Sequence, residues 1–216
     1  MAQIFPRSAN ALARASIFVA LFLGGAGGFA LWELAHSGYV TREGIVLPQP
    51  VPFSHDHHVA QIGIDCRYCH TNVERGASAG IPPTQTCMNC HNQIWTNAEI
   101  LEPVRASFRD GKPIAWNRVN DLPDFVYFNH SIHVAKGVAC TTCHGPIDKM
   151  PLMYQGKPLT MGWCLDCHRD PVKNLRPREE VTNVYWQPPA DLAAKQKEWA
   201  LANHVQSKVS CSNCHR

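Results

Sequence analysis

The sequence has few charged residues and little sign of β-structure. Asp, Glu, Lys and Arg together make up 17% of the 216 residues, and the formal net charge is only +3. So small a positive charge gives no support for a nucleic-acid-binding protein. No long run alternates apolar and polar residues, and 16 Pro and 14 Gly interrupt most stretches. These absences argue against a sheet-based core and predict sparse, mainly helical secondary structure.

No cysteine stands alone, because all ten lie in five blocks where Cys-x-x-Cys is followed directly by His. The blocks, called sites 1 to 5 in chain order, are Cys66/Cys69/His70, Cys87/Cys90/His91, Cys140/Cys143/His144, Cys164/Cys167/His168 and Cys211/Cys214/His215. This motif attaches haem c: the two thiols bond the porphyrin vinyl groups, and the adjacent His is the proximal iron ligand. The sequence therefore predicts five covalently bound haem c groups.

Zinc and disulfides are the alternative uses of such pairs. The 17 residues between the first two pairs would suit a zinc ribbon. With 12 His in 216 residues, however, a His after all five pairs has a chance probability on the order of one in a million. Five pairs would also leave one without a partner in four-cysteine zinc sites. A redox-active disulfide protein normally carries one such pair.

One uncharged apolar stretch, from Ala15 to Trp32, precedes the first site. Its 18 residues are about enough to cross the hydrocarbon layer as a helix. Arg7 and Arg14 lie before it, so the positive-inside rule keeps the N-terminus in the cytoplasm. A cleaved signal peptide would have a shorter apolar region. We predict an uncleaved anchor over residues 13–34 in the bacterial inner membrane, with the rest of the chain in the periplasm.

Small residues share one face of this predicted anchor. Ala20, Gly24 and Gly28 are spaced four apart, which lets another helix approach closely. Glycine is also simply commoner in membrane helices than in soluble ones. We favour a partner membrane subunit.

The segment before site 1 recurs before site 3. The two copies are Phe53-x-His55-x-x-His58 and Phe128-x-His130-x-x-His133, 75 residues apart. Each copy is followed by two sites, which indicates duplication of a dihaem module. The predicted organisation is a cytoplasmic N-terminus 1–12, the anchor 13–34, a linker 35–50, module 1 at 51–91, a connector 92–125, module 2 at 126–168 and a C-terminal segment 169–216 with site 5.

Each haem iron needs a sixth ligand or keeps an open position, and the repeat supplies four candidates. We predict His55, His58, His130 and His133 as distal ligands, with the two histidines of each copy serving different haems. His57 lies outside the repeat and is expected to face solvent.

The fifth distal ligand stays open among His204, Met153 and Met161. His204 precedes Cys211 by seven residues, as His133 precedes Cys140. A Met ligand would instead raise the reduction potential of that haem relative to His.

After Trp32, 184 residues remain for five haems, or about 37 residues each. So short a chain cannot bury its usual share of apolar surface, so the porphyrins should form much of the core. The predicted fold is a mostly irregular and α-helical multihaem cytochrome c with little β-structure and one N-terminal transmembrane helix. Outside the membrane the clearest helical pattern is 190–205, with Leu201, His204, Val205 and Lys208 on one face.

These motifs resemble known families. The Phe-x-His-x-x-His segments before Cys-x-x-Cys-His resemble the low-potential class III multihaem cytochromes. The single N-terminal span, the two modules, the Met-Gly-Trp-Cys-Leu-Asp-Cys-His-Arg segment at 161–169 and the fifth site together resemble the membrane-anchored pentahaem subunit of alternative complex III. That resemblance implies electron transfer from a quinol-oxidising membrane complex to a monohaem cytochrome c or another periplasmic acceptor. It also implies polytopic membrane subunits and an iron-sulfur protein as partners.

Two other classes remain. A quinol dehydrogenase of the NapC/NrfH type also has one N-terminal helix, but it resembles a tetrahaem pattern and would handle quinol itself. A multihaem reductase needs a haem with an open position, often with Lys as proximal ligand, and no Cys-x-x-Cys-Lys is present. The sequence therefore favours electron transfer over catalysis by this chain alone.

Overall fold

The computed structural model describes residues 4–215, and the chain divides into two units after Arg42. The first unit contains α1 (Ser8–His36) and the short α2 (Gly38–Thr41). The second unit runs from Glu43 onward and carries all five sites.

Helix α1 has the properties of a membrane-spanning helix. Its most apolar window has a mean hydropathy of 1.8, and no residue of the helix is buried within the chain. At 1.5 Å per residue, its 29 residues extend about 43 Å, which exceeds the roughly 30 Å hydrocarbon layer. The helix begins before the predicted residue 13 because the Ala-rich segment from Ser8 favours helix formation. A methyl group added at Gly24 or Gly28 would meet no atom within 4 Å, so this face is open.

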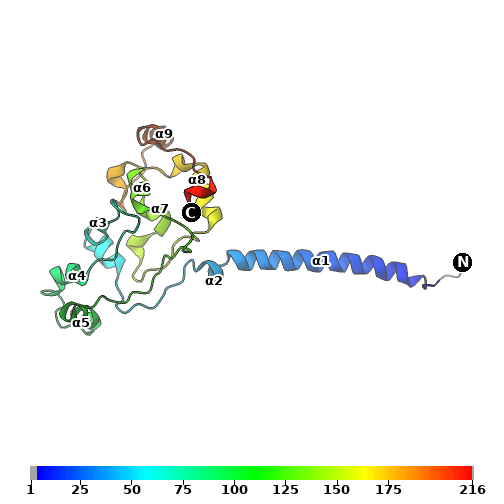
Figure 1. The fold of residues 1–216 in the computed structure, drawn as a ribbon, viewed down its shortest axis with the longest axis horizontal. Helices are drawn as coiled ribbons and strands as arrows, with labels where there is room; N and C mark the ends of the chain where they lie inside the picture. Colours follow the sequence, from blue (N-terminus) through cyan, green and yellow to red (C-terminus); the bar gives the residue numbers. More distant parts are fainter. Residues whose placement is uncertain (1–3, 216) are drawn as a thin grey trace. The chain divides into compact units, whose positions relative to one another are not determined.

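The second unit is built from short helices joined by irregular segments (Figure 1). The α-helices are α3 (Cys66–Cys69), α4 (Thr84–His91), α5 (Glu102–Asp110), α6 (His130–Ala135), α7 (Cys140–His144), α8 (Met161–Arg169) and α9 (Leu192–Ala202). A π-helix, η1, spans Asp56–Gln61, and 3-10 turns cover Glu99–Leu101, Ile147–Lys149, Pro171–Asn174, Arg178–Glu180 and Cys211–Asn213. In the described part of the chain, isolated bridges such as Glu43 to Gln155 and Val138 to Leu175 take the place of a sheet.

The apolar core of this unit is small. The largest fully buried side chains among the described residues are Met150, Leu175 and Val181. A separate small cluster of Val51, Leu101 and Val104 lies where α4 packs against α5. Burial on this scale contributes little for a unit of this length, since each buried aliphatic side chain contributes about 1.5–3 kcal/mol. The fold class predicted from the sequence is confirmed, and the polypeptide core is as sparse as expected.

The helix predicted at 190–205 is present but shorter. It ends at Ala202, and His204 has a left-handed φ of 50°. His204, Val205 and Lys208 therefore lie beyond the helix and do not share a face with Leu201, as the sequence pattern had suggested. The buried side of α9 is formed instead by Gln196 and Ala200. The Gln196 side chain satisfies the carbonyls of Lys173 and Leu175, an interaction that hydrophobic spacing does not reveal.

Candidate functional site

The attachment motifs lie in short helical segments, and those of sites 2 and 4 are parts of the longer helices α4 and α8. Helix α3 consists of Cys66–Cys69, α7 begins at Cys140, and a 3-10 turn begins at Cys211. Residues three apart in a helical turn face the same side, so the two sulfurs of a motif point in a common direction. The turn at site 1 is fixed by Asp65, whose carboxylate accepts a hydrogen bond from the Arg67 N–H. The helical turn thus presents both thiols of a motif to one ligand.

The ten cysteines of the motifs are free of disulfide bonds, but they differ in exposure. Eight are half-buried, whereas Cys90 of site 2 and Cys211 of site 5 are exposed to solvent. In α4, Cys87 packs against the small apolar cluster shared with α5, while Cys90 lies one turn later, near the end of the helix. Cys90 therefore departs from the half-buried setting of the other cysteines of sites 1 to 4. Its role as an attachment residue stays a prediction that rests on the motif and not on burial.

The two repeat segments have matching ring arrangements. Phe53 stacks on His58 with ring centres 4.3 Å apart, and Phe128 stacks on His133 at 4.5 Å. The first His of each copy meets the same Phe edge-on, at 4.9 Å for His55 and 4.8 Å for His130. The backbones differ, since the first segment is π-helical and the second α-helical. Each Phe therefore separates two histidines that point in different directions.

Three histidines of the repeat face the histidine of an attachment motif. The ring centres are 6.2 Å apart for His58 and His91, 6.2 Å for His130 and His144, and 6.0 Å for His133 and His168. Two metal–nitrogen bonds of about 2.0 Å, with each ring centre roughly 1.1 Å behind its nitrogen, place two axial imidazoles about 6.2 Å apart. The side chains present therefore fit an iron held between two histidines at these three sites.

His55 lies near His70, the histidine of site 1. Burial, and then the neighbouring charges of His70, His58 and His144, lower the pKa of His55 to about 4. Burial, followed by the charges of His130 and His70, likewise lowers the pKa of His144 to about 4. Both imidazoles are therefore neutral at physiological pH, which is the form that ligates a metal.

Several of these rings are oriented by backbone carbonyls. The Nδ1–H of His70 donates to the Gly80 oxygen at 2.7 Å, and that of His91 to the Ile94 oxygen at 3.1 Å. His58 donates to the Ser54 oxygen at 2.8 Å, and His133 to the Asn129 oxygen at 2.7 Å. Such bonds fix the tautomer and leave Nε2 free to bind a metal.

The histidine of site 5 is also oriented by a backbone carbonyl, but its distal side differs from that of sites 2 to 4. His215 donates from Nδ1 to the Phe125 oxygen at 3.0 Å, and its ring lies 5.7 Å from the Phe125 ring. In the described part of the chain, no ring contact or hydrogen bond joins His215 to His204, Met153 or Met161. His204 is exposed, Met161 is 69% exposed and Met153 is half-buried.

His57, expected to face solvent, is exposed, and its Nδ1–H donates to the Gln61 side-chain oxygen at 3.0 Å. The carbonyls of Ala77 and Gly80, which orient His130 and His70, were not found by sequence reasoning. Backbone acceptors leave no residue-type signal; Gly80, with φ of 81°, is the one local hint of a constrained loop.

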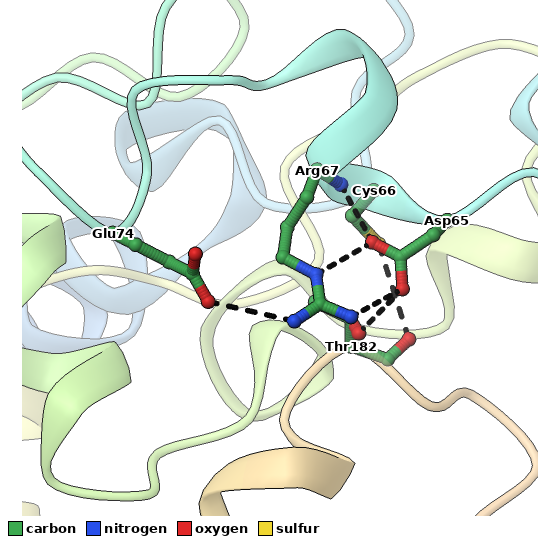
Figure 2. Close-up of polar contacts among 5 residues, drawn as sticks. All are labelled: Asp65, Cys66, Arg67, Glu74 and Thr182. Carbon is green, nitrogen blue, oxygen red and sulfur yellow. Dashed lines mark hydrogen bonds and ion pairs between the residues drawn. The ribbon is translucent and has the colours of Figure 1, made fainter.

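Asp65 joins site 1 to the C-terminal segment (Figure 2). Its carboxylate accepts from Arg67 Nε at 2.9 Å and from the Thr182 hydroxyl at 2.8 Å. Arg67 also approaches Glu74 at 3.5 Å. The side-chain hydrogen bond from Arg67 is the largest of the causes that lower the pKa of Asp65 to about 2. The carboxylate is therefore a cap, an ion-pair partner and a link between segments 117 residues apart.

The lowered pKa of Asp65 predicts how the stability of the protein changes in acid. The stabilisation from a carboxylate of lowered pKa is full above its ordinary pKa of about 3.8 and disappears as the pH falls through about 2. Asp65→Asn should therefore lose stability at neutral pH and show a weaker decline between pH 4 and pH 2 than wild type. Because Asp65 and Arg67 are more than one-third exposed, the effect should be modest. Thermal unfolding of both proteins at several pH values measures this difference in stability. If the unfolding midpoints of the two proteins fell in parallel with pH, the prediction would be contradicted.

Comparison with known proteins agrees with these features. Residues 126–216 match the family described as cytochrome c7 and related cytochrome c. The chain is 30% identical over 161 residues to the multihaem cytochrome c subunit of a menaquinone reductase from Nitratidesulfovibrio vulgaris, covering 65% of this chain and 74% of that protein. The chain therefore belongs to the multihaem c-type cytochromes that include this subunit, and its second half is a cytochrome c7-like domain.

Proposed function

We propose that this chain is an electron-transfer subunit that carries five haem c groups, one at each Cys-x-x-Cys-His motif. The observation that carries the proposal is the 6.0–6.2 Å spacing of three histidine pairs, which suits iron with two axial imidazoles. Haem iron held in this way accepts and returns one electron without opening a coordination position. The chain's own residues attach the porphyrins, supply axial ligands and shield the irons from water.

The proposed ligand pairs follow the repeat. His58 serves site 2, His130 serves site 3 and His133 serves site 4, each opposite the proximal histidine of that site. His55 stands 75 residues before His130, as His70 stands 74 before His144, so we assign His55 to site 1. The distal ligand of site 5 remains one of His204, Met153 and Met161.

The haem number can be measured directly. The denatured chain should exceed the mass of its polypeptide by five haem groups of roughly 0.6 kDa each, since thioether bonds survive denaturation. Alkaline pyridine spectra of the same sample give an independent count of iron. An excess of four haems or fewer would contradict the assignment of every motif, and an excess matching zinc would exclude haem altogether.

We further propose that the chain works in a membrane quinol-oxidising complex of the alternative complex III type. Electrons would pass from a quinol site in partner subunits to a monohaem cytochrome c or a similar periplasmic acceptor. The open small-residue face of α1 at Gly24 and Gly28 suits a close helix contact with a membrane partner. Purification from membranes in mild detergent tests this proposal. An iron-sulfur protein and polytopic subunits should co-purify, whereas a homo-oligomer that oxidises quinol unaided would support the NapC/NrfH type.

The similarity to a menaquinone reductase subunit favours a second candidate function. In this candidate, the chain belongs to a complex of several subunits that transfers electrons to quinone and so reduces it. The direction can be tested on the purified complex. Rapid reduction of the haems by a quinol, followed by reduction of added cytochrome c, supports quinol oxidation. Faster quinone reduction from reduced periplasmic cytochrome supports the second candidate.

For the membrane orientation we propose that the N-terminus is cytoplasmic and that the second unit, from Glu43 onward, is periplasmic. We call this second unit the haem unit. Arg7 and Arg14 lie before or within the first turns of α1, on the side that the positive-inside rule keeps in the cytoplasm. A membrane-impermeant amine reagent applied to intact cells with a permeabilised outer membrane should label lysines from Lys112 to Lys208. Labelling only after lysis would contradict this orientation.

A further inference from the structure

Neighbouring attachment sites contact one another through residues inside or next to their motifs, and these contacts identify which sites are adjacent. Sites 1 and 2 meet through the residues between their cysteines. The Asn89 side chain of site 2 donates to the Tyr68 hydroxyl of site 1 at 3.2 Å. Sites 1 and 2 therefore lie side by side.

Site 1 also adjoins site 3, in the other module. The link runs through Cys66 and Cys140, the first cysteines of these sites. Both are held by one short segment, because the Cys140 N–H donates to the Val181 oxygen at 3.2 Å and the Cys66 thiol approaches the Thr182 oxygen at 4.0 Å.

A loop of module 1, residues 76–80, connects the same two sites. The Gly80 oxygen accepts from His70 of site 1 at 2.7 Å. The Ala77 oxygen accepts from the His130 ring at 2.7 Å and from the His130 backbone N–H at 3.1 Å. One loop thus orients the proximal histidine of site 1 and the proposed distal histidine of site 3.

Sites 3 and 4 are joined by α6. Its His130 faces His144 of site 3, and its His133, one turn later, faces His168 of site 4. Because one short helix carries both of these histidines, sites 3 and 4 lie side by side.

Site 5 lies against site 4. The Tyr127 N–H donates to the Cys214 oxygen at 2.8 Å, and the next residue, Phe128, stacks on His133. The Lys208 N–H approaches the His168 oxygen at 3.4 Å.

We propose that the haem sites form one unbranched series in the order 2, 1, 3, 4, 5, in which modules 1 and 2 exchange electrons between the adjoining sites 1 and 3. Sites 2 and 5 are then the two ends, where partners deliver or remove electrons. Each internal transfer oxidises one ferrous iron and reduces the neighbouring ferric iron, so no bond forms or breaks. In Figure 1, α4 of site 2 lies at one end of the haem unit and α8 with the C-terminus at the other. The series rests on the proposed function, because it requires a haem at each motif.

Cryo-electron microscopy of the complex purified from membranes tests the order directly. The iron positions, assigned by their attached cysteines, should place haem 1 between haems 2 and 3, and haem 4 between haems 3 and 5. Two results would overturn the series and leave the proposed function standing, provided that the map contains five haems. In one, haem 3 lies closer to haem 2 than to haem 1; in the other, haem 5 lies at the module 1 end. A motif without haem would instead refute the proposed function.

A pair of variants tests the order without a map. His55→Met should raise the potential of haem 1, and His58→Met that of haem 2. The charge at the iron whose potential has changed acts on the neighbouring haems, and this interaction weakens with distance. In redox titrations of the intact complex, His55→Met should shift the midpoints of two other haems and His58→Met the midpoint of one. The opposite counts would place haem 2 inside the series and overturn the proposal. The haem mass of each variant confirms that five haems are retained.

Discussion

Replacing His133 with alanine should convert one of the five haems from low-spin to high-spin. The imidazole of His133 lies 6.0 Å from that of His168, so its loss removes one strong-field ligand from a single iron. The ligands of the other four proposed haems are unaltered, so their spin states should not change. Electron paramagnetic resonance and visible spectra of the oxidised protein measure the high-spin share, which should be about one-fifth of the total iron. The same result is expected separately for His55→Ala, His58→Ala and His130→Ala.

His57→Ala is the matched control for these variants. His57 is adjacent to His58 and its ring is 5.5 Å from that of His58, yet it is exposed and bonds Gln61. Its removal should leave all five haems low-spin. A high-spin signal in His57→Ala together with an unchanged spectrum in His58→Ala would refute the ligand assignment drawn from the repeat. Loss of a distal ligand should also lower the thermal stability of its module, because the metal bond ties together segments distant in the chain.

Gly156→Ala should destabilise the haem unit around site 3. A Cβ at this position would lie 2.5 Å from the carbonyl oxygen of His144 and 3.0 Å from Cα of Gly145. Both neighbours are backbone atoms, so the conflict cannot be relieved by turning a side chain. Overpacking of this kind costs about 1–3 kcal/mol. A lower unfolding midpoint in detergent, followed by haem absorbance, should accompany a change in the spectrum of one haem, since the shifted residue, His144, is the proposed proximal ligand of site 3.

Gly162→Ala provides the comparison. Gly162 lies in the first turn of α8, two residues before Cys164, and a Cβ there would meet no atom within 4 Å. Alanine favours the helix by up to about 1 kcal/mol over glycine, so the unfolding midpoint should stay the same or rise. Equal loss of stability in both variants would indicate a general intolerance of substitution near the motifs and would contradict the argument from close approach.

Much of the fold class could be predicted from the kinds of structure that the composition excludes. With so many Pro and Gly and so few residues per motif, no sheet and no large apolar core could be expected, and the described residues have neither. The C-terminal helix was predicted too long because apolar spacing continues through Val205. The left-handed backbone at His204 ends the helix earlier, and a polar residue, Gln196, fills part of its buried side.

The sequence by itself determined the five Cys-x-x-Cys-His motifs, with their predicted proximal histidines, the duplicated Phe-x-His-x-x-His segment and the N-terminal apolar stretch. Each of these depends on residue type and short spacing, which a single helical turn preserves. Only the tertiary structure showed that His58, His130 and His133 face the motif histidines of sites 2, 3 and 4, and which motif cysteines, such as Cys90, are exposed. Those relations depend on contacts such as His130 with Ala77, 53 residues apart, and Asp65 with Thr182, 117 apart. Backbone carbonyls accept hydrogen bonds whatever the side chain, so such contacts arise from the path of the folded chain and leave no pattern in the sequence.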